Sequence, residues 1–288
     1  MGISEVGYCN LCGASQCTLF HILVGCTKAL TDKRYTWRHD SVLATLLQIL
    51  VPVLIRHNAV KVTASRPDSI VFVKATPAGA KTTALKPAIC SRQPRGKSLL
   101  TAANDWQLLI DFDCRRMLFP TNIVATSERP DVVLWSTSTK TVLMFELTCP
   151  AEENFIKANA RKMNRYASLC EQIHDAGWTP VLRTIEAGAR GFVSHRFQKA
   201  FRELGLTSKE ASTACKDISS VTARCSYGIW LMRKSAIWNA SRELVAPNHF
   251  LQPAPTSTPP LLLVSQPARG NCDWHLGLTQ NSTGAPSS

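Results

Sequence analysis

The stretch that decides the fold is RPDVVLWSTSTKTVLMFEL, residues 129–147. Residues 132–135 and 142–147 are apolar runs typical of β-strands, and the polar residues 136–140 between them predict a turn. Folded as a hairpin, the two strands bring Asp131 and Glu146 close together. Two carboxylates in an otherwise apolar sheet are unfavourable unless a cation lies between them. The pair therefore predicts a site for a hard, oxygen-binding ion such as Mg²⁺.

A helix is predicted at residues 152–176, directly after this hairpin. Lys162 and Tyr166 are four residues apart and share one helical face, close to a stripe that we expect to pack on the sheet. The stripe consists of Ile156, Ala160, Met163, Ala167 and Cys170. In metal-dependent phosphodiester hydrolysis, a lysine beside the metal orients the nucleophile or stabilises the developing charge. The alternative is that Lys162 extends to solvent and Tyr166 fills the core.

The N-terminal region contains the spacing Cys9-x2-Cys12-x8-His21-x4-Cys26. Three thiolates and one imidazole at such spacing suit a closed tetrahedral Zn²⁺ site, which stabilises a module too small to fold on its own core. Two alternatives stay open. The four residues are unrelated buried side chains, or Cys17 takes the position of one of these ligands.

Basic and aromatic residues alternate directly after this cluster: Arg34, Tyr35, Trp37, Arg38 and His39. Arginines neutralise phosphates and aromatic rings stack on exposed bases, so the segment predicts nucleic-acid binding. The alternative is that Tyr35 and Trp37 pack on the cysteine module.

The chain of 288 residues has a formal net charge of +13, and the excess is concentrated early. The first 99 residues hold 13 Lys and Arg against 4 Asp and Glu, as expected of a polyanion-binding arm or of a solvated basic segment. No apolar run reaches the roughly 20 residues that a membrane helix needs, and no secretory signal is evident. We therefore expect an intracellular protein that does not enter a membrane.

Alternating strands and helices predict an α/β fold. Besides the hairpin and its helix, the expected elements are helices at 40–57, 194–204 and 213–238, strands at 106–112 and 180–186, and a short strand at 70–73. The predicted organisation is a zinc module with the following segment at 1–60, a basic linker at 61–98, the main domain at 99–245 and a disordered tail at 246–288.

Several motifs together resemble one family. They are the Cys/Cys/His/Cys spacing, RYTWRHDSVL from Arg34, RPDVVLWS from Arg129, ELTCPAEEN from Glu146 and RGFV from Arg190. In this combination they look like the C-terminal part of non-LTR retrotransposon polyproteins, where a zinc knuckle precedes a restriction-like endonuclease of the PD-(D/E)xK superfamily. The resemblance implies a mixed sheet flanked by helices, Mg²⁺ or Mn²⁺ held by Asp131 and Glu146, and nicking of target DNA.

The sequence departs from the simplest superfamily pattern at Thr148, where the motif has lysine. In related retrotransposon nucleases the lysine has moved to the next helix with a tyrosine one turn later, which matches Lys162 and Tyr166. Lys157 is the competing lysine, without a tyrosine at helical spacing. Two carboxylates before the hairpin are alternatives for a further metal ligand: Asp111 and Asp113.

The sequence thus predicts a metal-dependent DNA endonuclease; the alternative is an inactive nucleic-acid-binding relic of the same element. Nothing before Cys9 resembles a polymerase, so we expect a fragment, a truncated copy or a gene product that kept only the nucleic-acid-binding and nicking end. The reverse transcriptase portion of the parent polyprotein is then a partner in trans. The expected partners are target DNA and the element's RNA. The substrate suggests a nuclear location, with the cytoplasm as the alternative.

Overall fold

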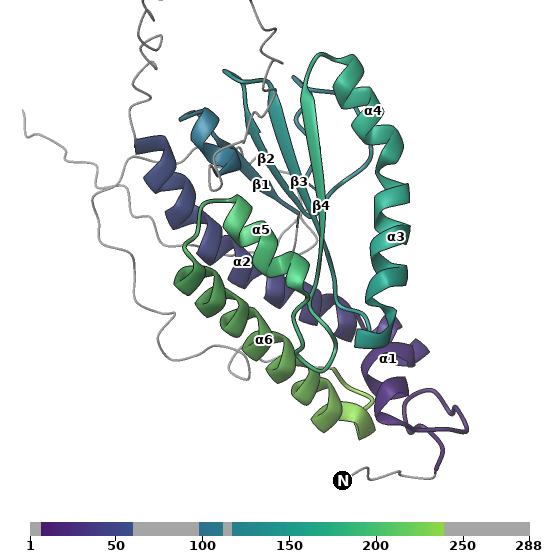
Figure 1. Ribbon diagram of the computed structural model, residues 1–288. Coiled ribbons are helices and arrows are strands. Elements are labelled where there is room, and N and C mark those ends of the chain that lie inside the picture. Colours follow the sequence, from purple (N-terminus) through teal and green to yellow (C-terminus); the bar gives the residue numbers. More distant parts are fainter. Residues whose placement is uncertain (1–6, 60–97, 112–116, 239–288) are drawn as a thin grey trace, which may run out of the picture.

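A computed structural model describes residues 7–59, 98–111 and 117–238. Its centre is a four-stranded mixed sheet in the order β1-β2-β3-β4. The strands are β1 (Gln107–Ile110), β2 (Val132–Ser136), β3 (Thr141–Thr148) and β4 (Thr179–Glu186). β2 is antiparallel to both β1 and β3, and β4 is parallel to β3, which confirms the predicted mixed α/β architecture (Figure 1).

The predicted hairpin forms β2 and β3. Val132 lies opposite Phe145 and Ser136 lies opposite Thr141. Every residue of β2 is buried, because helices cover both faces of the sheet and leave no face for alternating polar residues. Asp105 holds the turn, since its carboxylate accepts hydrogen bonds from the Ser138 amide at 2.8 Å and from the Ser136 hydroxyl.

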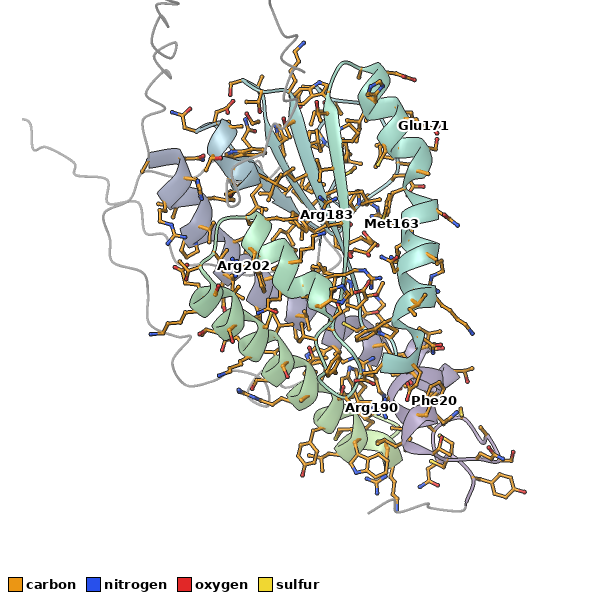
Figure 2. All side chains as sticks on the ribbon, viewed as in Figure 1. Phe20, Met163, Glu171, Arg183, Arg190 and Arg202 are labelled. Atoms are coloured by element: carbon orange, nitrogen blue, oxygen red, sulfur yellow. The ribbon has the colours of Figure 1, made fainter. Side chains whose placement is uncertain are left out.

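Helices form a layer on each side of the sheet (Figure 1). On one side are α3 (Phe155–Arg165) and α4 (Ala167–Asp175). On the other are α2 (Arg34–Ala59), α5 (His195–Glu203) and α6 (Ser208–Leu231). The strand side chains alternate between two hydrophobic clusters: Leu108, Val132 and Phe145 contact the α2, α5 and α6 side, and Leu109, Val133 and Met144 contact the α3 and α4 side. Side chains fill both interlayer spaces (Figure 2).

The long helix α2 belongs to this core rather than to a separate N-terminal unit. Its buried residues Val42, Leu46, Leu50 and Leu54 lie in the same hydrophobic cluster as strands β1 to β4. The helix starts at Arg34, six residues before the predicted boundary at 40. By length and composition α2 is apolar enough to cross a membrane, but an apolar core helix passes the same test, and α2 packs on α6.

The predicted helix at 152–176 is wrong as one element. A 3₁₀ turn (Glu152–Asn154) precedes α3, and Tyr166 separates α3 from α4. The predicted packing stripe is also wrong, since Ile156 is 78% and Met163 40% exposed. The buried residues are instead Ala158 in α3, Leu169 and Ile173 in α4, and Tyr166 between the two helices.

The later elements follow the prediction with shifted ends. Strand β1 covers residues 107–110 of the predicted 106–112. Helix α6 begins at Ser208, ahead of the predicted residue 213, because Thr207 and Glu210 form a capping box, and a 3₁₀ turn (Met232–Lys234) follows it. The predicted linker with its strand at 70–73, the predicted tail at 246–288 and Asp113 lie outside the described residues.

Candidate metal centres

The cysteine module forms a compact turn, a π-helical segment (His21–Gly25) and the short helix α1 (Thr27–Thr31). The turn closes when the Gly13 amide donates to the Cys9 carbonyl at 2.8 Å and the Cys9 amide donates to the Ala14 carbonyl at 2.8 Å. Gly13 has φ +75°, a conformation that suits glycine. This turn brings Cys9 and Cys12 to one side, facing the two ligands that follow.

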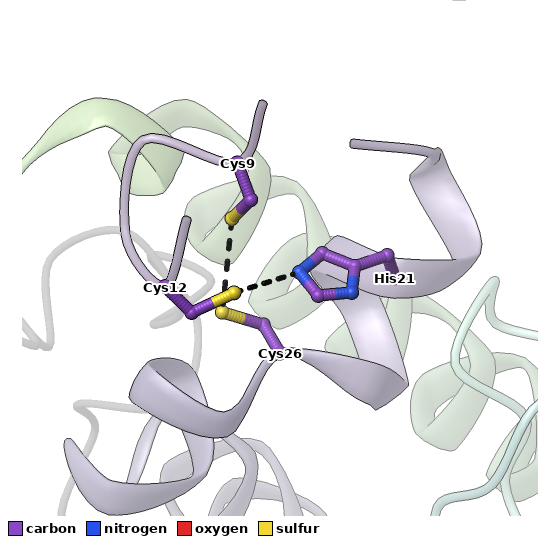
Figure 3. Close-up of side chains that lie close together, drawn as sticks. All are labelled: Cys9, Cys12, His21 and Cys26. Atoms are coloured by element: carbon purple, nitrogen blue, oxygen red, sulfur yellow. Dashed lines mark hydrogen bonds between the residues drawn. The ribbon is translucent and has the colours of Figure 1, made fainter. Parts of the chain in front are cut away.

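Cys9, Cys12, His21 and Cys26 converge as predicted (Figure 3). Their four ligand atoms lie within 4.8 Å of one another, and Cys17 is not a member of the group. The Cys9 Sγ–Cys26 Sγ distance is 3.9 Å and the Cys12 Sγ–His21 Nε2 distance is 3.2 Å. Tetrahedral Zn²⁺ with ordinary bond lengths separates sulfur from sulfur by about 3.8 Å and sulfur from nitrogen by about 3.6 Å. The donor set and its spacing therefore fit zinc.

The thiols differ in how readily they ionise. Burial raises the pKa of Cys9, but hydrogen bonds from the Cys12 and Leu11 amides stabilise its thiolate and lower that pKa to about 6. Burial raises the pKa of Cys26 to about 11. A divalent cation would offset this cost, because metal binding replaces the proton on each thiol.

The predicted nucleic-acid residues mostly pack the module onto the rest of the fold. Arg34 is completely buried, and its guanidinium donates to the Met232 carbonyl at 2.7 Å and the Ser235 carbonyl at 2.8 Å. It also lies over the ring of Trp238, 4.9 Å from the centroid. Arg38 is 1% exposed and donates to Ser226 and to the Cys149 carbonyl. Neither guanidinium is at the surface that a phosphate would meet.

The aromatic residues of this segment follow the packing alternative. The Tyr35 hydroxyl donates to the Ile22 carbonyl at 2.8 Å and accepts from the Cys26 amide at 3.0 Å. Trp37 packs edge-on against Trp238, with ring centroids 5.2 Å apart. Tyr35 thus fixes the chain beside the ligand Cys26, and the nucleic-acid role of this segment stays a prediction.

The second candidate centre lies at one end of the sheet. Glu146 is paired with Thr184 across β3 and β4, and it follows Phe145, whose partner is Val132. Asp131 precedes Val132, and its carbonyl accepts a hydrogen bond from the Asp111 amide at 2.9 Å. Successive strands therefore carry a row of polar residues at one level: Asp111, Asp131, Glu146 and Thr184.

Lys162 completes the predicted group. Its ammonium donates to the Oε1 atom of Glu146, and the two side chains are 17% and 2% exposed. Lys157 is exposed on the same helix, so Lys162 is the lysine that contacts Glu146. Tyr166 is buried and donates to the Arg129 carbonyl at 3.1 Å, which holds the end of α3 against the segment that carries Asp131.

The carboxylates are bound into the backbone. The Asp131 amide donates to Glu146 Oε2 at 3.1 Å, and the Leu147 amide donates to Asp131 Oδ2 at 2.7 Å. Burial raises the pKa of Glu146 and the charge of Asp131 raises it further, while Lys162 opposes both. Burial and the nearby charge of Glu146 also raise the pKa of Tyr166, which keeps its proton at neutral pH.

His39, one of the residues predicted to bind nucleic acid, also lies in this group. Its Nε2 lies 3.4 Å from Asp131 Oδ2 and its Nδ1 lies 3.1 Å from Asp40 Oδ1. Burial lowers the pKa of His39, but the hydrogen bonds with Asp131 and Asp40 outweigh it and raise that pKa well above its usual range. Only the long-range packing of α2 brings His39 here, so no local spacing in the sequence signals it.

The Asp111 carboxylate contacts Met117 and Arg129 rather than the residues of this group. Its Oδ1 accepts a hydrogen bond from the Met117 amide at 2.9 Å, and its Oδ2 lies 3.9 Å from Arg129 Nε. Within residues 7–59, 98–111 and 117–238, the cysteine module is the one group of three or more Cys, His, Asp and Glu side chains arranged to hold a metal ion. The carboxylate centre offers two acidic ligands, Asp131 and Glu146.

No protein-family model matches the chain, and no curated protein matches it. The structure itself shows a mixed four-stranded sheet flanked by helices and an N-terminal Cys₃His cluster suited to a metal such as Zn²⁺.

Proposed function

We propose that this protein is a metal-dependent endonuclease that hydrolyses phosphodiester bonds in DNA. The observation that carries the proposal is the meeting of Asp131, Glu146 and Lys162 at one end of the sheet. Asp131 directly precedes β2, Glu146 lies in β3 and Lys162 lies in α3; Glu146 and Lys162 are largely buried charges. Buried charges of this kind are costly, and they are commonest where a site uses them.

The two carboxylates fit a hard divalent cation by their chemistry. Both offer oxygen donors, and their mutual repulsion contributes to the raised pKa of Glu146, a cost that a cation between them would remove. When bound, Mg²⁺ or Mn²⁺ would supply a water of lowered pKa and neutralise charge on the scissile phosphate. Asp131 and Glu146 would hold the ion.

The other residues have roles that follow from their contacts. Lys162 fixes Glu146 and offers an ammonium group for the charge that develops on the phosphate. Tyr166 keeps its proton and ties α3 to the Arg129 carbonyl, so it positions Lys162 one turn earlier on the chain. His39 restrains Asp131 from the α2 side.

The N-terminal module, whose Cys₃His group is suited to a metal ion, and the excess of positive charge support a nucleic-acid substrate. Together with the sequence motifs they support an origin in a non-LTR retrotransposon, with target-site nicking as the reaction and DNA as the partner. A nuclear location follows from that substrate.

The test is nicking of supercoiled plasmid by the full chain with Mg²⁺, Mn²⁺ or EDTA. Asp131→Asn keeps a carbonyl oxygen for the Leu147 amide but removes the charge, so we expect folded protein without nicking. Asp175→Asn is the control, since that side chain is 83% exposed. Lys162→Ala should lose activity and Lys157→Ala should keep it. Full nicking by Asp131→Asn would end the proposal.

A second candidate, nucleic-acid binding without cleavage, is favoured by one feature of the same group. Both oxygens of Glu146 are engaged by protein donors, and Asp131 is bound by the Leu147 amide and His39. Such a network also serves to join the ends of β2, β3, α2 and α3. Salt-dependent DNA binding by folded protein that never nicks would select this function.

A further inference from the structure

A cavity of about 450 Å³ opens between the β4–α5 loop and helices α5 and α6. Figure 2 labels Arg190 in this loop. The lining combines apolar surface with polar side chains. Four serines, Gln198, His195 and Lys216 contribute to it, and none of the described lining residues is acidic. Hydroxyl, amide and ammonium groups together suit an anion that accepts several hydrogen bonds, such as a phosphodiester.

Positive charge lies on the α6 wall. Lys216 lines the cavity itself. Arg224 donates a hydrogen bond at 2.7 Å to the hydroxyl of Ser220, another lining residue. The nearby Arg190 is neutralised, since it pairs with Glu152 and Glu153 at 2.7 Å each. Lys216 is thus the cationic side chain of the lining, and Arg224 adds a second positive charge next to Ser220.

An exposed aromatic ring stands at the rim. Phe192 is 65% exposed although it also lines the cavity. Its ring leans on Phe155, with centroids 6.2 Å apart and planes at 31°, so one face is supported from within the protein. A large exposed ring beside a cationic polar cavity is the arrangement that binds single strands, where a base stacks while the backbone lies in the groove.

The loop that presents Phe192 is fixed. The Gly188 amide donates to the Phe192 carbonyl at 2.7 Å, and the Gly191 amide donates to the Gly188 carbonyl at 2.8 Å. Gly191 has φ +95°, and a Cβ there would meet Ala223 Cβ at 2.9 Å, so the loop lies directly on α6. The ring is therefore held in position before any ligand arrives.

We propose that this cavity binds the backbone of an unpaired nucleic-acid strand whose base stacks on Phe192. This inference rests on the proposed function, because the strand would be part of the nuclease substrate. β3 and β4 are parallel, so the loop after β4 leaves the same end of the sheet as Glu146. Phe155, which supports the ring, begins the helix that carries Lys162. The strand in the cavity is thus a single-stranded segment of the nuclease substrate.

The experiment measures binding without added Mg²⁺ or Mn²⁺, which separates binding from cleavage and leaves zinc in the cysteine module. A fluorescein-labelled 20-mer of thymidylate and a matching abasic strand are titrated with the full chain by anisotropy. Phe192→Leu should weaken thymidylate binding roughly tenfold, Phe192→Trp should restore it, and neither should change binding of the abasic strand. Melting temperatures of the variants check that they are folded.

The cation is tested by the salt dependence of binding. Lys216→Gln should reduce the slope of log K against log salt by about 0.7, the value for one lost phosphate contact on a single strand. Lys209→Gln is the control, because Lys209 is exposed on the same helix and does not line the cavity. Unchanged thymidylate binding by Phe192→Leu, or equal weakening on thymidylate and abasic strands, overturns the proposal. If the protein binds the strands as expected but does not nick DNA, only the proposed cleavage is refuted.

Discussion

Replacing Lys162 by methionine tests whether the carboxylate centre is a coupled group of buried charges. The variant keeps the length of the side chain but removes the ammonium that contacts Glu146, whose side chain is 2% exposed. Loss of one partner of a buried ion pair costs about 3–5 kcal/mol. Because Lys162 is 17% exposed, water reaches part of the vacated position, and we expect a loss of about 3 kcal/mol at pH 7, the lower end of that range.

The loss should depend on pH in a defined direction. Burial and Asp131 already raise the pKa of Glu146, and removing Lys162 raises it further. The folded variant then holds a proton that the unfolded chain has released, so its stability increases as the pH falls. The difference in free energy of unfolding between the variant and the unchanged protein should therefore become smaller from pH 7 to pH 5. In a Glu146→Gln background the same substitution should cost only about 1 kcal/mol, the size of a lost hydrogen bond.

The assay is urea unfolding followed by fluorescence of the 7 tryptophans. The buffer contains no Mg²⁺ or Mn²⁺, so that no such cation replaces the lysine and the cysteine module keeps its zinc. The unchanged protein, the two single variants and the double variant form a double-mutant cycle at each pH. An equal loss at pH 7 and pH 5, or an equal loss with and without the Glu146 charge, would refute the coupling.

Two further outcomes concern the N-terminal module. Cys12→Ser should release zinc to a chelating dye and lower the melting temperature, because a structural zinc site contributes folding free energy; an unchanged metal content would refute the ligand assignment. Arg34→Met should cost about 3 kcal/mol of stability, since it leaves two partly buried carbonyls and the Asp32 carboxylate without the buried guanidinium that donates to them, and should leave the salt dependence of DNA binding unchanged. Lower DNA affinity at unchanged stability would instead assign Arg34 to a nucleic-acid interface.

Local patterns in the sequence predicted the parts of the fold that depend on neighbours along the chain. The β2–β3 hairpin follows from two apolar runs around a polar turn, and the ligands of the cysteine module follow from their spacing. The same reasoning failed for the packing stripe on α3. Apolar residues there suggested the buried face, yet the polar side chains of Asn159 and Lys162 face the sheet, because Thr184 and Glu146 offer them partners. At this polar site the helix turns polar side chains toward the sheet and leaves apolar ones exposed, the reverse of the usual arrangement.

Contacts between distant segments could not be predicted in this way. Arg34 and Arg38 have the composition of a nucleic-acid segment, and only the tertiary fold brings carbonyl and hydroxyl acceptors to them from α6 and the chain that follows it. Likewise, Phe192 reads as one apolar residue in a loop. Its exposure and the cavity beside it depend on where α6 packs.

The first turns of α2 connect the two candidate metal centres, which gives the buried basic and aromatic segment a structural role. The Tyr35 hydroxyl accepts a hydrogen bond from the amide of Cys26, one of the four residues suited to hold zinc. One turn later, Arg38 donates to the carbonyl of Cys149, next to the end of β3, and His39 lies against Asp131. A shift of these turns would move both sites, because the same rigid helix carries all three contacts. The cysteine module thus contributes to the position of the carboxylate centre through packing, whether or not its own surface meets nucleic acid.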